Sequence, residues 1–73
     1  MYFMINVMYF GVPQGYDTYD YVVFGKANAE RRFEAEKADH DVVHVTMHEC
    51  YVNAEGIVTQ GNLIKEYEAE EEM

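Results

Sequence analysis

Residues 2–10 alternate between two series of side chains, and both series are predominantly apolar. One series is Phe3, Ile5, Val7 and Tyr9, and the other is Tyr2, Met4, Asn6, Met8 and Phe10. Since aromatic and β-branched residues favour extended backbone, this alternation predicts a strand over Tyr2 to Phe10. A strand that is apolar on both sides is either covered on both faces of its sheet or presents one stripe to a partner.

A second strand and a helix are predicted next. Glycines and the single proline favour a loop over Gly11 to Thr18. Tyr19 to Phe24 resumes strand-forming residues, which predicts an antiparallel pair joined by that eight-residue connection. From Lys26 to His40 the strong helix formers Ala, Glu, Arg and Lys predominate, so this segment is predicted to be one helix. Its only large apolar residue, Phe33, is the expected anchor on the sheet.

A second hairpin is predicted after the helix. Over Val42 to Val52 one side carries Val43, Val45, Met47 and Tyr51, and the other His44, Thr46, His48 and Cys50. Glu49 interrupts the inward series and marks a candidate bulge. Asn53 to Gly56 has the composition of a tight turn, since Gly56 adopts positive φ without strain, and Ile57 to Thr59 begins the returning strand.

The segment after Gly61-Asn62 allows three interpretations. It could be a bulge inside one long strand to Tyr67, a tight turn into a fifth strand, or a terminal helix capped by Asn62. The extended alternatives are favoured, because Leu63 and Tyr67 share one side of an extended chain and a partner strand is already available.

The order strand, strand, helix, strand, strand predicts one α+β domain over residues 1–73. We expect an antiparallel sheet of four strands, or five, with the helix packed on one face. Such a fold leaves the other sheet face uncovered. Dimerisation or partner binding through that face is therefore a hypothesis.

Composition narrows the function classes. The chain has 73 residues and a net charge of −9, from 14 acidic and 5 basic side chains. This balance argues against direct binding of nucleic acid by a basic face. So short a chain has little room for a rigid catalytic cleft, serine is absent, and no phosphate-binding glycine loop occurs, so we expect no enzyme activity.

No cofactor, metal or membrane role is expected. His44 and His48 would lie about 13–14 Å apart in a strand, too far to share one ion, and only His48 and Cys50 could converge. One cysteine suits a reducing compartment, and Met1 to Phe10 is too short to span a bilayer. The expected location is the cytoplasm.

The acidic residues gather outside the predicted helix. Lys26 to Lys37 holds four bases and three acids, which leaves one base and eleven acids elsewhere. The acidic C-terminal end, residues 66–73, contains Glu66, Glu68, Glu70, Glu71 and Glu72. In an extended chain alternate glutamates project on one side at about 6.8 Å intervals, a pitch comparable to that of phosphates along a nucleic-acid strand. Such a row could occupy a basic groove; alternatively, it is a solvated tail that maintains solubility.

A second group of candidate binding residues lies in the first hairpin. Asp17 and Asp20 are interleaved with Tyr16 and Tyr19. Tyrosine adds contact area and hydrogen bonds beside acidic groups at interfaces. Together with the five glutamates of the acidic end, these four residues are the predicted partner-binding set.

The layout resembles that of small acidic inhibitor proteins of bacteriophages. The resemblance rests on the opening apolar strand, the passage into a helix through Phe24-Gly25-Lys26-Ala27, the closing hairpin and the acidic end. Phage proteins of this form, including anti-CRISPR proteins and inhibitors of host polymerases or repair enzymes, occlude a surface of a nucleic-acid-handling protein. The resemblance implies stoichiometric inhibition without catalysis, in the cytoplasm of a host cell.

The sequence therefore predicts a binding protein that blocks a basic nucleic-acid-binding surface of a host or defence protein by acidic mimicry. The alternative is a self-associating structural or accessory protein that dimerises through the uncovered sheet face and whose acidity serves solubility.

Overall fold

A computed structural model describes residues 1–11 and 15–69 and contains four strands and one helix. In chain order they are β1 (Tyr2–Gly11), β2 (Gly15–Phe24), α1 (Lys26–Lys37), β3 (Val42–Val52) and β4 (Val58–Glu68). All strands pair antiparallel in one sheet with the order β2-β1-β3-β4. The predicted α+β class and the order of elements are confirmed.

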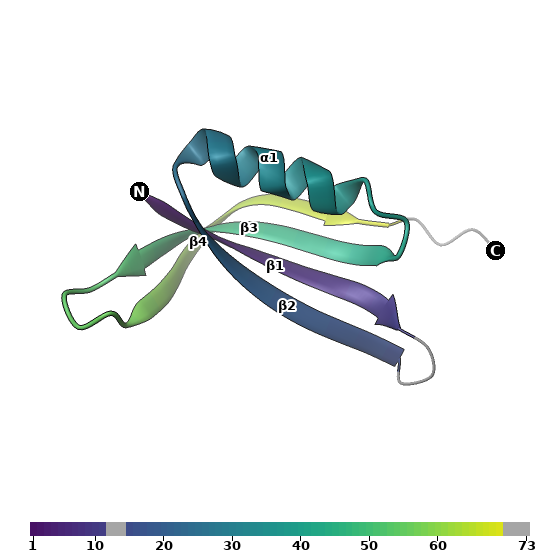
Figure 1. Cartoon of the computed structure of the whole chain (residues 1–73), viewed down its shortest axis with the longest axis horizontal. Coiled ribbons are helices and arrows are strands. Elements are labelled where there is room, and N and C mark those ends of the chain that lie inside the picture. Colours follow the sequence, from purple (N-terminus) through teal and green to yellow (C-terminus); the bar gives the residue numbers. More distant parts are fainter. Residues whose placement is uncertain (12–14, 70–73) are drawn as a thin grey trace.

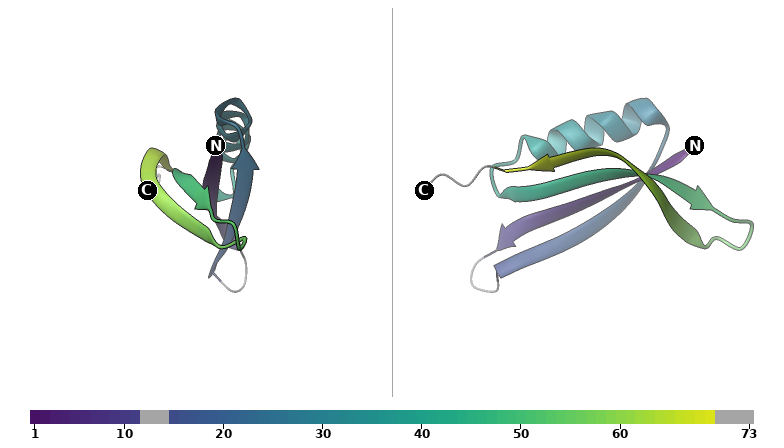
Figure 2. Two further views of the ribbon diagram at one scale, coloured as in Figure 1. Left: turned by 90° about the vertical axis from the view of Figure 1, so that its left-hand side faces the viewer. Right: turned by 180° about the vertical axis from the view of Figure 1, so that it is seen from behind.

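The helix covers one face of the sheet and leaves the other face open. Figure 1 shows α1 lying along the sheet, and the end view in Figure 2 shows it on one side only. The tip of the β3–β4 hairpin projects beyond the helix (Figure 1). Because β1 lies between β2 and β3, its residues are central to the covered face.

The core forms between α1 and the two central strands. The buried apolar residues of this layer are Phe3, Ile5, Val7, Ala29, Phe33, Val42, Val45 and Met47. Phe33 is only 3% exposed, so its predicted role as the anchor of the helix is confirmed. Ala29 lies one turn before Phe33 and is fully buried, and its small side chain allows the helix to lie close to the sheet.

Two predicted boundaries were wrong. The second strand begins at Gly15, four residues before the predicted start at Tyr19, so the connection is shorter than expected. The β1–β2 ladder continues to the pair Gly11 and Gly15, and the rings of Phe10 and Tyr16 pack edge to face with centroids 5.6 Å apart. This aromatic contact extends the hairpin into residues whose glycines had indicated a loop. The helix ends at Lys37, three residues before its predicted end at His40.

A bulge in β3 changes which valine faces the core. Tyr9 pairs with Val42 while Met8 pairs with His44, so Val43 is an extra residue in β3. Val42 is 2% exposed and occupies the core, whereas Val43 is only half-buried. The prediction that Val43 faces the core was wrong, because the bulge shifts the alternation by one residue.

The pairing of β4 with β3 is also irregular, and this decides among the three interpretations of the segment after Gly61-Asn62. Between Leu63 and Gln60, β4 has two residues where β3 has only Glu49. The bulge within one long strand is therefore confirmed, and the fifth strand and the terminal helix are wrong. A Cβ on Gly61 would lie 2.7 Å from Cε2 of Tyr51 and 3.3 Å from the Glu49 carbonyl oxygen, so a larger residue at this position would displace the Tyr51 ring. The Tyr51 hydroxyl donates a 2.8 Å hydrogen bond to Glu49, which raises the pKa of Tyr51.

A polar connection joins α1 to the β1–β2 hairpin. The Tyr9 hydroxyl donates a hydrogen bond to the Glu36 carboxylate, and Glu36 forms an ion pair with Arg32, one turn before it on the helix, at 3.0 Å. The Arg32 guanidinium lies 4.0 Å from the centroid of the Tyr21 ring. Partial burial, followed by the bond to Glu36, raises the pKa of Tyr9 well above its ordinary value.

Truncating the helix anchor should destabilise the fold strongly. We expect Phe33→Ala to lower the free energy of unfolding by about 3–5 kcal/mol, because it leaves a cavity between α1 and the sheet. Urea unfolding followed by circular dichroism measures this change. Phe24→Ala is the matched control: Phe24 is 61% exposed, so its truncation should cost about 1 kcal/mol or less. Equal losses in the two variants would contradict the assignment of the core.

Stability should fall in alkali through Tyr9. Because the pKa of Tyr9 is raised in the folded state, its contribution is complete below about pH 10, where the unfolded chain begins to ionise, and is lost as the pH rises further. We expect the free energy of unfolding to decline less steeply above pH 10 in Tyr9→Phe than in the parent, as measured by urea unfolding between pH 9 and 11.5. An unchanged slope in Tyr9→Phe would refute the linkage.

Candidate partner-binding surface

The uncovered side of the sheet, here termed the open face, displays the side chains that alternate with the core. Its residues form rows across all four strands. Two adjacent rows are Asp20, Asn6, Thr46 and Glu66, and Thr18, Met8, His44 and Glu68. Apart from Met8, these rows are polar, in contrast to the apolar series on the helix-covered face.

Aromatic pairs mark both ends of the β1–β2 hairpin on the open face. At one end the rings of Tyr2 and Phe24 pack edge to face, with centroids 5.1 Å apart. At the other end Phe10 and Tyr16 form the pair described above. These four side chains are between 41% and 61% exposed. Exposed aromatic residues of this kind are frequent energetic centres of protein interfaces.

Charge on the open face is of one sign among the described residues. Asp20, Glu66 and Glu68 lie there, whereas no Lys or Arg of the described chain does. Four bases belong to α1, and Lys65 pairs with Met47 on the helix-covered side, 5.6 Å from the Phe33 ring. The open face is therefore acidic, apart from two histidines, His44 and His48.

One carboxylate of this face already has a partner. Nε2 of His44 lies 2.7 Å from Oε2 of Glu66, so the imidazole holds this side chain in place. Glu68 forms no ion pair or side-chain hydrogen bond with any residue that the structure describes. Glu66 and Glu68 alternate along β4 as expected. The Glu66 carboxylate is engaged by His44, whereas the Glu68 carboxylate has no side-chain partner among the described residues.

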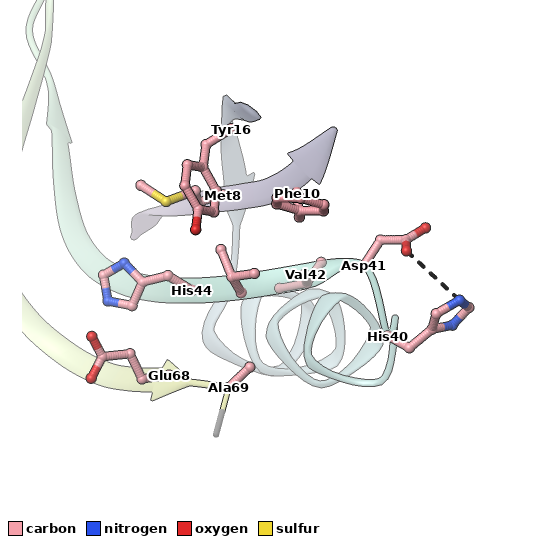
Figure 3. Close-up of a pocket in the computed structure, with 10 residues that line it drawn as sticks. Met8, Phe10, Tyr16, His40, Asp41, Val42, His44, Glu68 and Ala69 are labelled. Atoms are coloured by element: carbon pink, nitrogen blue, oxygen red, sulfur yellow. Dashed lines mark ion pairs between the residues drawn. The ribbon is translucent and has the colours of Figure 1, made fainter. Parts of the chain in front are cut away.

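A groove of about 660 Å³ lies at the end of the open face that carries Phe10 and Tyr16. Its lining residues are Met8, Phe10, Tyr16, His40, Asp41, Val42, Val43, His44, Glu68 and Ala69. Figure 3 shows Met8, Phe10 and Tyr16 on one side of the β3 backbone and Glu68 with Ala69 on the other. A smaller hollow of about 310 Å³, bordered by Asn6, Thr18 and Asp20, shares Met8 and His44 with the groove, so the two adjoin.

The structure divides the predicted partner-binding residues between two faces. Tyr16, Asp20, Glu66 and Glu68 lie on the open face. Asp17 and Tyr19 lie on the helix-covered side: Asp17 pairs with Tyr9, and the Tyr19 ring packs 5.5 Å from the Tyr9 ring. Glu70, Glu71 and Glu72 lie outside the described residues. A role in binding stays a prediction for all nine.

Sequence reasoning missed the groove itself. Its base includes Val43, which reaches the open face only because of the β3 bulge. Three valines occur among Val42 to Val45, and either Val42 or Val43 suits the core equally well by composition. No local signal selects between them, since the selection depends on pairing with β1.

The polar side chains offer no assembled metal site. Within residues 1–11 and 15–69, no three His, Cys, Asp or Glu side chains are placed to share an ion. Cys50 is 2% exposed and is buried at the Tyr2 end of the sheet. The helix, α1, is too short and too polar to cross a membrane.

Comparisons with known proteins add no relative. The chain matches no protein-family model, no curated protein and no solved structure.

Proposed function

We propose that this chain is a stoichiometric binding protein whose open face occupies a basic, nucleic-acid-binding surface of another protein. One observation supports this most directly: the open face combines exposed aromatic pairs with Asp20, Glu66 and Glu68 and has no Lys or Arg among the described residues. Acidic and aromatic groups on one exposed face suit a partner rich in Lys and Arg.

The same charges disfavour the alternative of self-association through this face. In a symmetric face-to-face dimer each copy presents the same patch to the other. Three carboxylates from each copy would give six at one interface, with only His44 and His48 of each copy to offset them. Like charges held close together across an interface cost several kcal/mol. A basic partner avoids that cost.

The apolar and acidic groups have separate tasks in this proposal. Desolvation of exposed rings, such as Tyr2 with Phe24 and Phe10 with Tyr16, would supply most of the affinity. The carboxylates would mainly accelerate association and fix orientation. Glu66 and Glu68 lie about 6.8 Å apart along β4, and Asp20 lies three strand spacings away, about 14 Å. Negative groups thus border both edges of the face, as phosphates border a nucleic-acid groove.

The proposal predicts competition with nucleic acid. Proteins captured from a bacterial lysate on the immobilised chain should lose binding to their nucleic acid when one equivalent of the chain is added. Fluorescence anisotropy of a labelled oligonucleotide measures this loss. A captured protein that binds the oligonucleotide and the chain at the same time would refute mimicry, and a concentration-independent homodimer with no captured protein would favour self-association.

The association rate with such a partner should fall as salt rises, because exposed charges lose influence beyond a Debye length of about 8 Å at physiological ionic strength. We expect the combined variant Asp20→Asn, Glu66→Gln and Glu68→Gln to associate more slowly at low salt and to lose most of the salt dependence, as measured by stopped flow.

The control for this prediction removes three carboxylates elsewhere, with Glu30→Gln, Glu34→Gln and Glu55→Gln. It matches the change in net charge but leaves the open face intact. If the two triple variants slow association equally, total charge rather than the open face is responsible.

A further inference from the structure

We propose that the groove beside Phe10 and Tyr16 is a binding site for an arginine side chain in an extended segment of the partner. This inference rests on the proposed function, since it names the group that the open face recognises.

The β3 bulge forms the groove. Val43 and His44 both lie toward the open face, since Val42 takes the adjacent position in the core. Two backbone hydrogen bonds hold the strands around this bulge: the Phe10 amide donates to the Asp41 carbonyl, and the Ala69 amide donates to the Val43 carbonyl, both at 2.9 Å. The groove is therefore bordered by backbone that is fixed on the β1 side and on the β4 side.

The two sides of the groove differ in chemistry. The β1–β2 side presents Met8 and the rings of Phe10 and Tyr16, which are 52% and 57% exposed. The opposite side presents the Glu68 carboxylate, and Asp41 lies at one end (Figure 3). A ligand that satisfies both sides needs an apolar or planar surface and a positive charge.

The negative charge of the groove is largely uncompensated. Glu68 has no ion-pair partner among residues 1–11 and 15–69. Asp41 lies 3.7 Å from Nε2 of His40, but these side chains are 66% and 95% exposed, so the pair contributes little. An anionic ligand would meet both carboxylates unfavourably, which excludes a phosphate or a nucleic acid as the occupant.

Arginine fits these features better than lysine does. A guanidinium is planar, weakly hydrated, stacks on aromatic rings and donates two parallel hydrogen bonds to one carboxylate. The fold already uses this contact once, where Arg32 lies over Tyr21. The aliphatic part of an arginine can lie on Val43 at the base of the groove, with the guanidinium between the rings on the β1–β2 side and the Glu68 carboxylate on the other. At about 660 Å³ the groove exceeds one side chain, so it also accommodates the neighbouring backbone of an extended segment.

Titration with short capped peptides tests the site without knowledge of the partner. The probe is acetyl-Gly-Arg-Gly-amide, and its lysine and citrulline counterparts remove planarity and charge respectively. We expect ¹⁵N NMR shifts confined to the groove, binding of the arginine peptide about two- to fivefold tighter than that of the lysine peptide, and no binding of the citrulline peptide at the same concentrations. Equal binding of the arginine and lysine peptides, or shifts spread over the whole acidic surface, would overturn the proposal.

Substitutions in the groove test which side chains contact the arginine. Glu68→Gln should weaken binding of the arginine peptide several-fold, and Phe10→Leu, which keeps an apolar side chain but removes the ring, should reduce the preference for arginine over lysine. Glu55→Gln removes one exposed carboxylate in the β3–β4 turn and should leave binding unchanged. If Glu55→Gln weakens binding as much as Glu68→Gln, the attraction is general and no arginine site exists.

The outcomes separate this inference from the proposed function. Competition with nucleic acid without any preference for arginine would support the proposed function and refute the groove. A specific arginine site in a chain that captures no nucleic-acid-binding protein would support the groove and refute the proposed function. Groove shifts in the free protein that change on dilution would show that a second copy is the occupant, which also refutes the inference.

Discussion

The fold depends on the burial of one sheet face beneath a single narrow helix. Only Ala29 and Phe33 of α1 are buried, so the helix supplies very little apolar surface. The central strands provide the rest of the core through Ile5, Val45 and Met47, which are fully buried. One helix of this kind covers one face and no more. Among the described residues, the open face is therefore a direct consequence of having a single helix beside the sheet.

The packing of that helix also explains where the positive charge lies. Basic side chains at its edges are used within the fold: Arg32 lies over Tyr21, and Lys37 lies 5.4 Å from the centroid of the Tyr67 ring. Lys65 extends toward Phe33 from the sheet. Since bases contribute to covering the core, the acids that remain on the other side are not neutralised by them. The packing of α1 on the sheet therefore also separates the basic side chains from the acidic open face.

Sequence patterns predicted those features that local chemistry determines. The alternation in β1, the helix formers around Phe33 and the turn composition around Gly56 were sufficient to predict the order of elements. In the structure Gly56 has the positive φ, 82°, that this turn requires. The patterns failed where pairing between strands that are far apart in the sequence decides which residue faces the core or where a strand begins. Composition does not distinguish Val42 from Val43 as the core residue, and the extension of β2 depends on Tyr16 meeting Phe10. The groove could not be predicted because it arises from that bulge.

The two edges of the sheet differ in a way that affects its growth. Two irregularities interrupt the pairing of β4, near Ile64 and near Gly61, so a further strand could not follow this edge in regular register. β2, in contrast, pairs with β1 through ten consecutive positions without a shift. The Phe10 amide donates its hydrogen bond on the β3 side of β1. The β2 residue opposite Phe10, and every second residue of β2 after it, therefore direct their backbone N–H and C=O groups away from β1, toward the free edge of the sheet. Any extension of this sheet by another molecule would therefore proceed in one direction only, from β2.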